Sequence, residues 1–400
     1  MDVGASWRAF VGFAAFGAFW GVWGASVPRV QEQAGIGDGA LGFALLFVGA
    51  GALPAMLLTG RALDRWGPGV AGAAVVALGG AGVVVAFTAV NLAGLCAGLA
   101  VVGATSGAAD VGINAAAGRA ERAGGRAVIT RAHGVFSGSV VLASLASGMA
   151  SSLPLVVPFM VAGGACLAAG VCLWASPGGF VVQREAVAPL GRHRVVPLLL
   201  IGVLGALAFA SENAHQSWSA VFVADELHSG GLSAVAPAVF AGTVAITRFS
   251  VGGVRAVRGV LLAGAAGAAG GAVVIAVAPT LVVAGIGLAV AATGTAVLFP
   301  TLLRLVAQNV RDDHRGRATS VFATVSYLGF LAGPVYVGLW ADAVGLRGAM
   351  VAVAAIAAVL FVLTPVLLRL GGFAGGEQSG QARAGVFSSA SPGRWSGTKR

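Results

Sequence analysis

Charged residues are scarce in this chain. Asp, Glu, Lys and Arg make up 10% of its 400 residues and apolar residues 58%, whereas soluble globular domains carry about 25% charged residues. The mean hydropathy is +0.93. This composition excludes an ordinary soluble domain and predicts a protein that lies in a membrane.

Lysine is almost missing, since Lys399 is the only lysine among the 24 Lys and Arg residues. The net charge of +10 comes from arginines in short loops between apolar segments. A nucleic-acid-binding protein instead gathers its basic residues on one polar domain. We therefore expect no nucleic-acid partner.

Motifs of membrane enzymes are also missing. The chain lacks the G-x-x-x-x-G-K-[ST] phosphate loop of an ATPase, the H-E-x-x-H of a zinc protease and the G-x-S-x-G of a lipase. Cys96, Cys166 and Cys172 lie in apolar segments without the C-x-x-C spacing of a metal or redox site. We expect no enzyme activity, no cofactor and no metal ion.

Apolar runs long enough to cross a bilayer are abundant. About 20 helical residues span the hydrocarbon core, and small-residue pairs such as Gly17/Gly21 and Gly329/Gly333 favour close helix packing. The first run is long enough to remain as an uncleaved helix. The runs predict an all-α membrane protein with twelve transmembrane helices, at 7–28, 40–59, 70–89, 92–116, 128–150, 154–175, 196–217, 232–253, 259–278, 280–303, 318–340 and 346–369.

The arginines mark one side of the predicted membrane. With the N-terminus in the cytoplasm, 22 of the 24 basic residues fall on the cytoplasmic side, and only Arg29 and Arg347 fall on the other. Cytoplasmic loops of membrane proteins carry such an excess. We therefore expect a multi-pass protein of the bacterial inner membrane with both termini in the cytoplasm.

The longest polar gap between spans divides the chain into two halves. It predicts a six-helix bundle at 1–175, a cytoplasmic linker at 176–195, a pseudo-symmetric second bundle at 196–370 and a disordered cytoplasmic tail at 371–400. Two related bundles are the usual plan of a transporter that rocks around a central cavity. We expect a monomer surrounded by the lipid bilayer.

The loop after the second span, TGRALDRWGPG, contains a glycine-flanked Asp-Arg pair. Glycine at a helix end allows a tight turn, and the aspartate can form an ion pair with a neighbouring helix in one conformation only. The loop resembles the G-x-x-x-D-R-x-G motif of the major facilitator superfamily, which implies a conformational latch at Gly60, Asp64, Arg65 and Gly67. In the second half Arg248 stands without an acidic partner, so the first half is expected to carry the latch.

Longer stretches resemble one bacterial branch of this superfamily, the fucose-permease-like and YbjJ-like inner-membrane proteins. They are FWGVWGASVPRVQEQAGIGDGALGFALL at the first span, DVGIN in the fourth and SENAHQSWSAVFVADELH at the seventh. The resemblance implies the major facilitator fold and a secondary transporter that moves a small organic solute by alternating access.

An acid lies inside the fourth predicted span. Asp110 precedes Arg119 by nine residues, which places it about 13 Å inside the membrane, level with His133 in the fifth span. Burial disfavours the charged form of a carboxyl group, so Asp110 and His133 are candidates for proton coupling. Asn114, one helical turn from Asp110, and Arg131 are candidates for contacting substrate. The alternatives for Asp110 are substrate contact and a static bridge to Arg131 or His133.

A second polar cluster, Glu212, Asn213, His215 and Gln216, lies in the seventh predicted span. Trp218 follows it and is expected at the membrane interface, where tryptophan is enriched. Glu212 is the deepest of the cluster and a further candidate for proton coupling, whereas Asn213 and Gln216 are candidates for lining a cavity. Alternatively, the whole cluster lies among lipid headgroups.

Aromatic residues recur along one face of the first span, at Phe13, Phe16, Trp20 and Trp23. Trp20 and Trp23 are therefore candidates for stacking on a solute, although a stripe used for packing or facing lipid is the alternative. Thr293 and Tyr327 are weaker candidates for the same cavity, because hydroxyl groups in membrane helices often bond only to backbone carbonyls.

The sequence thus predicts a proton-coupled secondary transporter, a symporter or an antiporter, of a small organic solute, for which the resemblance favours sugar-like chemistry. Protons are favoured over sodium because one carboxylate beside His133 suits titration better than the many oxygen ligands of a metal ion. A drug or natural-product exporter driven by proton antiport is the first alternative. A membrane sensor or assembly partner that moves nothing is the more distant one.

Overall fold

The computed structural model describes residues 3–124, 128–175, 192–250, 256–310 and 312–373, and these ranges are helical without a β-strand. The first six helices are α1 (Val3–Ala34), α2 (Asp38–Trp66), α3 (Gly69–Thr88), α4 (Leu92–Gly124), α5 (Val128–Met149) and α6 (Val156–Trp174). They are followed by α7 (Arg192–Asp225), the short 3-10 helix η1 (Gly230–Leu232), α8 (Val235–Ser250), α9 (Val257–Ala276), α10 (Leu281–Ala296), α11 (Leu298–Asn309) and α12 (Asp312–Leu370).

The described helices form twelve membrane spans, as predicted. Eleven helical segments are long and apolar enough to cross a membrane, and α10 and α11 together form one of them. At about 1.5 Å per residue, the 59 residues of α12 are far too long for one crossing of a core about 30 Å thick. Gly345 breaks α12 with a non-helical backbone at φ 78°, so α12 provides two spans.

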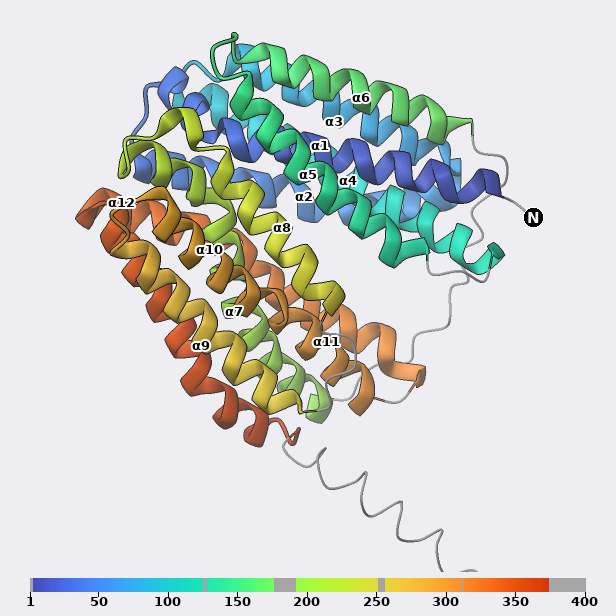
Figure 1. Ribbon diagram of the computed structural model, residues 1–400. Coiled ribbons are helices and arrows are strands. Elements are labelled where there is room, and N and C mark those ends of the chain that lie inside the picture. Colours follow the sequence, from blue (N-terminus) through green and yellow to red (C-terminus); the bar gives the residue numbers. More distant parts are fainter. Residues whose placement is uncertain (1–2, 125–127, 176–191, 251–255, 311, 374–400) are drawn as a thin grey trace, which may run out of the picture.

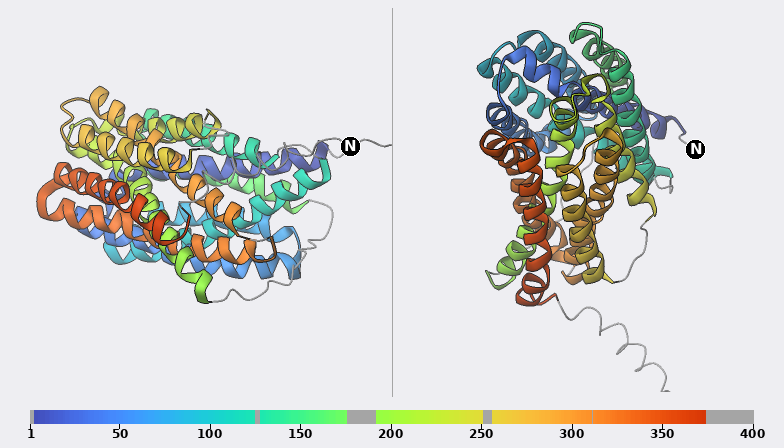
Figure 2. Two further views of the ribbon diagram at one scale, coloured as in Figure 1. Left: turned by 90° about the horizontal axis from the view of Figure 1, so that it is seen from below. Right: turned by 60° about the vertical axis from the view of Figure 1, so that its left-hand side comes forward.

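The helices assemble into two groups, α1 to α6 and α7 to α12, shown in Figure 1. The groups touch through α2 with α12, α5 with α8 and α1 with α7. They meet at one end of the molecule and diverge toward the other (Figure 1), and Figure 2 shows the two groups from two further directions. The predicted linker, 176–195, and tail, 371–400, lie largely outside the described residues, and the bundle boundaries stay a prediction.

Small residues bring helix backbones into direct contact in both groups. A Cβ atom on Gly17 or Gly21 of α1 would collide with carbonyl oxygens of α5. A Cβ atom on Gly329 or Gly333 of α12 would collide with the carbonyl oxygens of Ala206 and Ala210 in α7. Because membrane helices gain little from burying apolar surface, such close backbone packing is a main source of their association.

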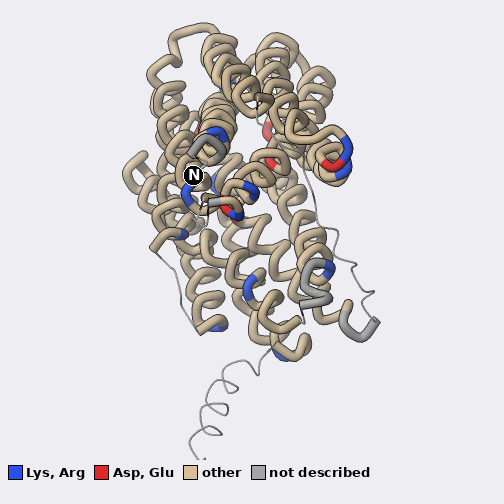
Figure 3. Tube along the Cα trace, turned by 90° about the vertical axis from the view of Figure 1, so that its right-hand side faces the viewer, with Lys and Arg blue, Asp and Glu red and all other residues tan. Residues whose placement is uncertain are grey.

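Arginines gather at the end where the two groups diverge. Successive spans run in opposite directions, so the start of α1, the end of α2 and the start of α5 meet there and bring Arg8, Arg65 and Arg131 together on one side. Figure 3 looks onto this end, which we call the arginine-rich end. At the opposite end Arg29 donates to Leu153 O at 2.6 Å, and Arg347 pairs with Glu226 at 2.9 Å.

Candidate functional site

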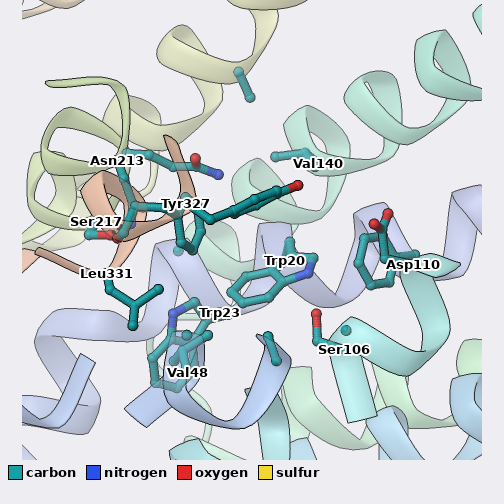
Figure 4. Close-up of a pocket in the computed structure, with 18 of the residues that line it drawn as sticks. Trp20, Trp23, Val48, Ser106, Asp110, Val140, Asn213, Ser217, Tyr327 and Leu331 are labelled. Carbon is teal, nitrogen blue, oxygen red and sulfur yellow. Dashed lines mark hydrogen bonds between the residues drawn. The ribbon is translucent and has the colours of Figure 1, made fainter. Parts of the chain in front are cut away.

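A cavity of about 250 Å³ lies between the two groups of helices. Its walls come from α1, α2, α4 and α5 on one side and from α7, α8 and α12 on the other. Figure 4 shows Trp20 between Tyr327 and Ser106, with Asp110 on one side of the indole and Trp23 on the other. The predicted candidates Trp20, Trp23 and Tyr327 therefore share one cavity with Asp110.

The aromatic stripe of α1 faces this cavity along most of its length. Phe16, Trp20 and Trp23 line it, and the ring of Trp20 packs edge-on against Phe16 with centroids 6.5 Å apart. Phe13 is 1% exposed and instead packs edge-on against His133, with centroids 5.0 Å apart. Helical periodicity in the sequence therefore identified the face of α1 that lines the cavity, although Phe13 packs against His133 and does not line it.

Asp110 is held by an amide and has no basic partner among the residues that the structure describes. The Nδ2 group of Asn114 donates to the Asp110 carboxylate at 3.0 Å and to the Asp110 backbone carbonyl at 2.9 Å. Among the described residues Asp110 forms no ion pair with Arg131 or His133, so the static bridge is not formed in this conformation. Asn114, Arg131 and His133 lie outside the cavity lining, and Asn114 acts by orienting the carboxylate.

The polar cluster of the seventh span lies mostly inside the protein, where Asn213 and His215 are buried, Glu212 is partly buried and Gln216 is exposed. Its depth relative to lipid headgroups stays a prediction. Helix α7 continues to Asp225, and Trp218 is 0% exposed and donates from Nε1 to Pro334 O at 3.2 Å. The prediction of an interfacial Trp218 is therefore wrong, because the indole packs inside the protein. Asn213 and Gln216 line the cavity, while His215 is buried against Phe240.

Asn213 repairs a gap in the hydrogen bonding of α12. Proline has no N–H, so Pro334 leaves the carbonyl of Phe330, four residues earlier, without its helical donor. The Nδ2 group of Asn213 donates to this carbonyl at 2.6 Å, and Asn213 Oδ1 accepts from Ser217 at 3.1 Å. The amide is therefore fixed in position at the cavity wall by two hydrogen bonds.

Arg248 also bonds to a backbone carbonyl that a proline leaves without its helical donor. Contrary to the sequence prediction, it has an acidic partner. Its Nη2 atom lies 2.8 Å from Glu212 Oε1 of α7, and its Nε atom donates to Ala296 O at 3.3 Å. Pro300 removes the N–H that would bond to the Ala296 carbonyl, which is where α10 ends. The pair joins two helices, so no local motif in the sequence could show it.

Removing either partner of this pair is expected to lower stability unequally. Arg248→Met deletes both bonds and leaves the Glu212 carboxylate, 14% exposed, without a counter-charge, which we expect to cost about 1–2 kcal/mol. Glu212→Gln keeps an oxygen acceptor and should cost less. Thermal unfolding of both single variants and of the double variant measures this. The double variant should be more stable than Arg248→Met, and an unchanged melting temperature for Arg248→Met would contradict the assignment.

The predicted latch residues lie at the arginine-rich end of α2. Gly67 adopts φ 74° and its N–H bonds to Leu63 O at 2.9 Å, which ends the helix. Asp64 and Arg65 are exposed, and Asp64 forms no ion pair within the described part of the chain. The turn has the geometry that its glycine predicts, and the latch role of Gly60, Asp64, Arg65 and Gly67 stays a prediction.

The threonines of the tenth span lie away from the cavity. Thr293 is exposed on the outer surface of α10 and donates to Ala289 O at 2.8 Å. Thr295 is buried and donates to Ala292 O at 3.4 Å. Both hydroxyl groups bond to backbone carbonyls of their own helix, and the structure places Thr293 outside the cavity lining.

Twelve spans in two groups around a central cavity are the architecture of a membrane transporter. A family model described as Major Facilitator Superfamily matches residues 253–395. An uncharacterized MFS-type transporter of Yersinia pestis is 30% identical over 329 residues, which cover 79% of this chain and 83% of that protein. Membrane protein MosC of Rhizobium meliloti is 26% identical over 84% of this chain and 83% of its own length. The chain belongs to the major facilitator superfamily.

Solved structures show the same fold at low sequence identity. The nucleoside transporter NupG, as its D323A mutant, superposes with a TM-score of 0.75 at 13% identity and covers 91% of this chain and 99% of its own. A D-xylose-proton symporter gives a TM-score of 0.71 at 13% identity, over 91% and 96% of the two chains. A bacterial homolog of the human lysosomal transporter Spinster, in an inward-facing and unoccupied conformation, gives 0.72 at 15% identity, over 92% and 98%.

Proposed function

We propose that this protein carries a small organic solute through the central cavity by alternating access and couples the movement to protons at Asp110. The observation that carries the proposal is the placement of this carboxylate in the cavity wall, beside the Asn114 amide and without a basic partner in the described ranges of the chain. A carboxyl group in an apolar setting can exchange a proton as the cavity opens to either side. Glu212 is a poorer candidate for this role because Arg248 already pairs with it.

The contacts between the two groups support alternating access. At the end opposite the arginine-rich end, a Cβ atom on Gly42 would lie 2.9 Å from the Cα atom of Gly338 and from Pro334 O. The groups diverge at the arginine-rich end (Figure 1). Because arginines mark the cytoplasmic side of membrane proteins, we assign this conformation as open to the cytoplasm of a bacterial inner membrane, with both termini on that side.

The solute class follows from the size and walls of the cavity. A volume of about 250 Å³ lies just below that of pockets for drug-sized ligands and suits a solute of one or two rings. Solved relatives in fold include a nucleoside transporter and a D-xylose-proton symporter, which supports a small polar solute. The aromatic lining favours export of a drug or natural product as the second candidate, with the same cavity and the opposite direction.

Filling the cavity tests the transport route. Wild type in proteoliposomes is screened for solute uptake with and without an imposed pH gradient. Ser106→Trp inserts a large side chain from the cavity wall of α4 and should reduce the flux to that of empty liposomes. Val101→Trp adds the same side chain at a position of α4 that is 53% exposed on the outer surface and should retain it. Equal flux through both variants would exclude this cavity as the route.

A further inference from the structure

The cavity has one charged side chain among the described residues that line it, the carboxylate of Asp110. A partly buried carboxylate is stabilised by a counter-charge or by further hydrogen bonds, and Asp110, itself partly buried, receives one side-chain hydrogen bond, from the neutral Asn114. A solute with a positive charge would supply what is missing. A solute with a carboxylate or phosphate would be repelled, because no described basic side chain lines the cavity to neutralise it.

The nearby positive charges do not change this balance. Arg248 is paired with Glu212 at 2.8 Å, and its guanidinium group also bonds to Ala296 O. Arg131 is exposed at the arginine-rich end, outside the lining. His133 packs against Phe13. Within the described part of the chain, Asp110 is therefore the charge without a counter-charge that a bound solute meets.

Aromatic rings surround the space beside this carboxylate. Trp20 lies next to Asp110, and Tyr327 approaches from the other group of helices (Figure 4). The faces of such rings attract cations, tryptophan most strongly. The Asn213 amide already bonds to Phe330 and Ser217, while Ser106, Gln216 and the Tyr327 hydroxyl group remain as neutral polar groups of the lining.

From these observations we infer that the cavity selects a compact organic cation, a protonated or quaternary amine on a flat ring. The inference rests on the proposed function of the cavity and narrows its solute class. The charged nitrogen lies at Asp110, and the ring lies between Trp20 and Tyr327. A volume of about 250 Å³ limits the solute to the scale of a single substituted ring or a small fused pair.

Three probes with the same ring and tethers of one or two methylene groups separate the charge classes. Phenethylamine is a cation at neutral pH, 2-phenylethanol is neutral and phenylacetate is an anion. Binding to the full chain in phosphatidylcholine nanodiscs is measured by isothermal titration calorimetry. We expect the amine to bind at least about tenfold more tightly than the alcohol and phenylacetate to bind most weakly. Equal affinities, tighter binding of the alcohol or of phenylacetate, or no binding of any probe would overturn the inference.

Two variants locate the selectivity. Asp110→Asn should reduce the affinity for the amine to that for the alcohol, whereas Glu32→Gln removes the same charge from an exposed position near the end of α1 and should keep the wild-type preference. Trp20→Leu should weaken amine binding several-fold and leave the protein folded. Thermal unfolding, followed by a signal that does not depend on tryptophan, checks that the variant is folded. A cation preference that survives Asp110→Asn would overturn the inference. If a neutral solute is transported and Ser106→Trp blocks its flux, the transport proposal stands and the inference of a cationic solute fails. If cations bind but no solute is transported, the inference of cation binding stands and the transport proposal fails.

Discussion

Replacing Asp110 by Asn abolishes uptake driven by a pH gradient in proteoliposomes, if the proposed coupling is correct. The substitution keeps the size and shape of the side chain and removes the group that binds and releases a proton. Because Asp110 is the one charged residue among the described residues of the cavity wall, no neighbouring acid can take over its role. We expect uptake to fall to the level of empty liposomes. A pH-sensitive dye trapped in the vesicles should report the loss of solute-dependent proton movement at the same time.

The control for this result is a carboxylate that plays no part in the cavity. Glu32→Gln changes the net charge by the same amount at an exposed position and should keep both uptake and proton movement. The amounts of reconstituted protein and the melting temperatures of the two variants are compared to exclude a folding defect. Undiminished gradient-driven uptake by Asp110→Asn, at normal protein levels, would remove Asp110 from the coupling mechanism.

Replacing Gly329 by Ala strongly destabilises the protein, through one added methyl group. The new Cβ atom would overlap the carbonyl oxygen of Ala206 in α7, and both sides of the contact are helix backbone. Neither side can adapt by rotating a side chain, so α7 and α12 must separate. Overpacking of this kind costs about 1–3 kcal/mol and sometimes more. The melting temperature in detergent and the yield of monodisperse protein measure the effect.

The matched control is Gly270→Ala in α9. Both substitutions improve helix propensity by about 1 kcal/mol, but a Cβ atom on Gly270 meets nothing within 4 Å. Gly270→Ala should therefore melt at the wild-type temperature or above it, while Gly329→Ala melts well below. If the two variants melt together, the close approach of α7 and α12 does not limit stability.

The sequence predicted the spans because each span carries its own signal, a long apolar run. It also pointed to Asp110, since a carboxylate in such a run is conspicuous on its own, and to Trp20 and Trp23, since helical periodicity places them on one face. The pairing of Arg248 with Glu212 escaped prediction because it depends on how two helices are rotated toward each other. Trp218 was misplaced because tryptophan suits both the membrane interface and a buried site with a hydrogen-bond acceptor, here Pro334 O.

The position of the cavity could not be predicted from the sequence for the same reason. Tyr327 of α12 and Asp110 of α4 line it together, but nothing local to either helix indicates that they meet. Thr293 was a cavity candidate that lies outside the cavity lining. A hydroxyl group in a span looks the same in sequence whether it faces a cavity or bonds to its own helix. Residue type identified the candidates, and only the packing of helices separated those that face the cavity.

The two proline sites have a mechanical consequence for the moving protein. A proline in a helix often allows the helix to bend, and Pro334 of α12 and Pro300 of the α10–α11 span are two such sites. Here the freed carbonyls of Phe330 and Ala296 are bonded to Asn213 and Arg248 of neighbouring helices. A neighbouring helix therefore restrains bending at both proline sites. We expect the second group of helices to move as one rigid body about its contacts with the first group.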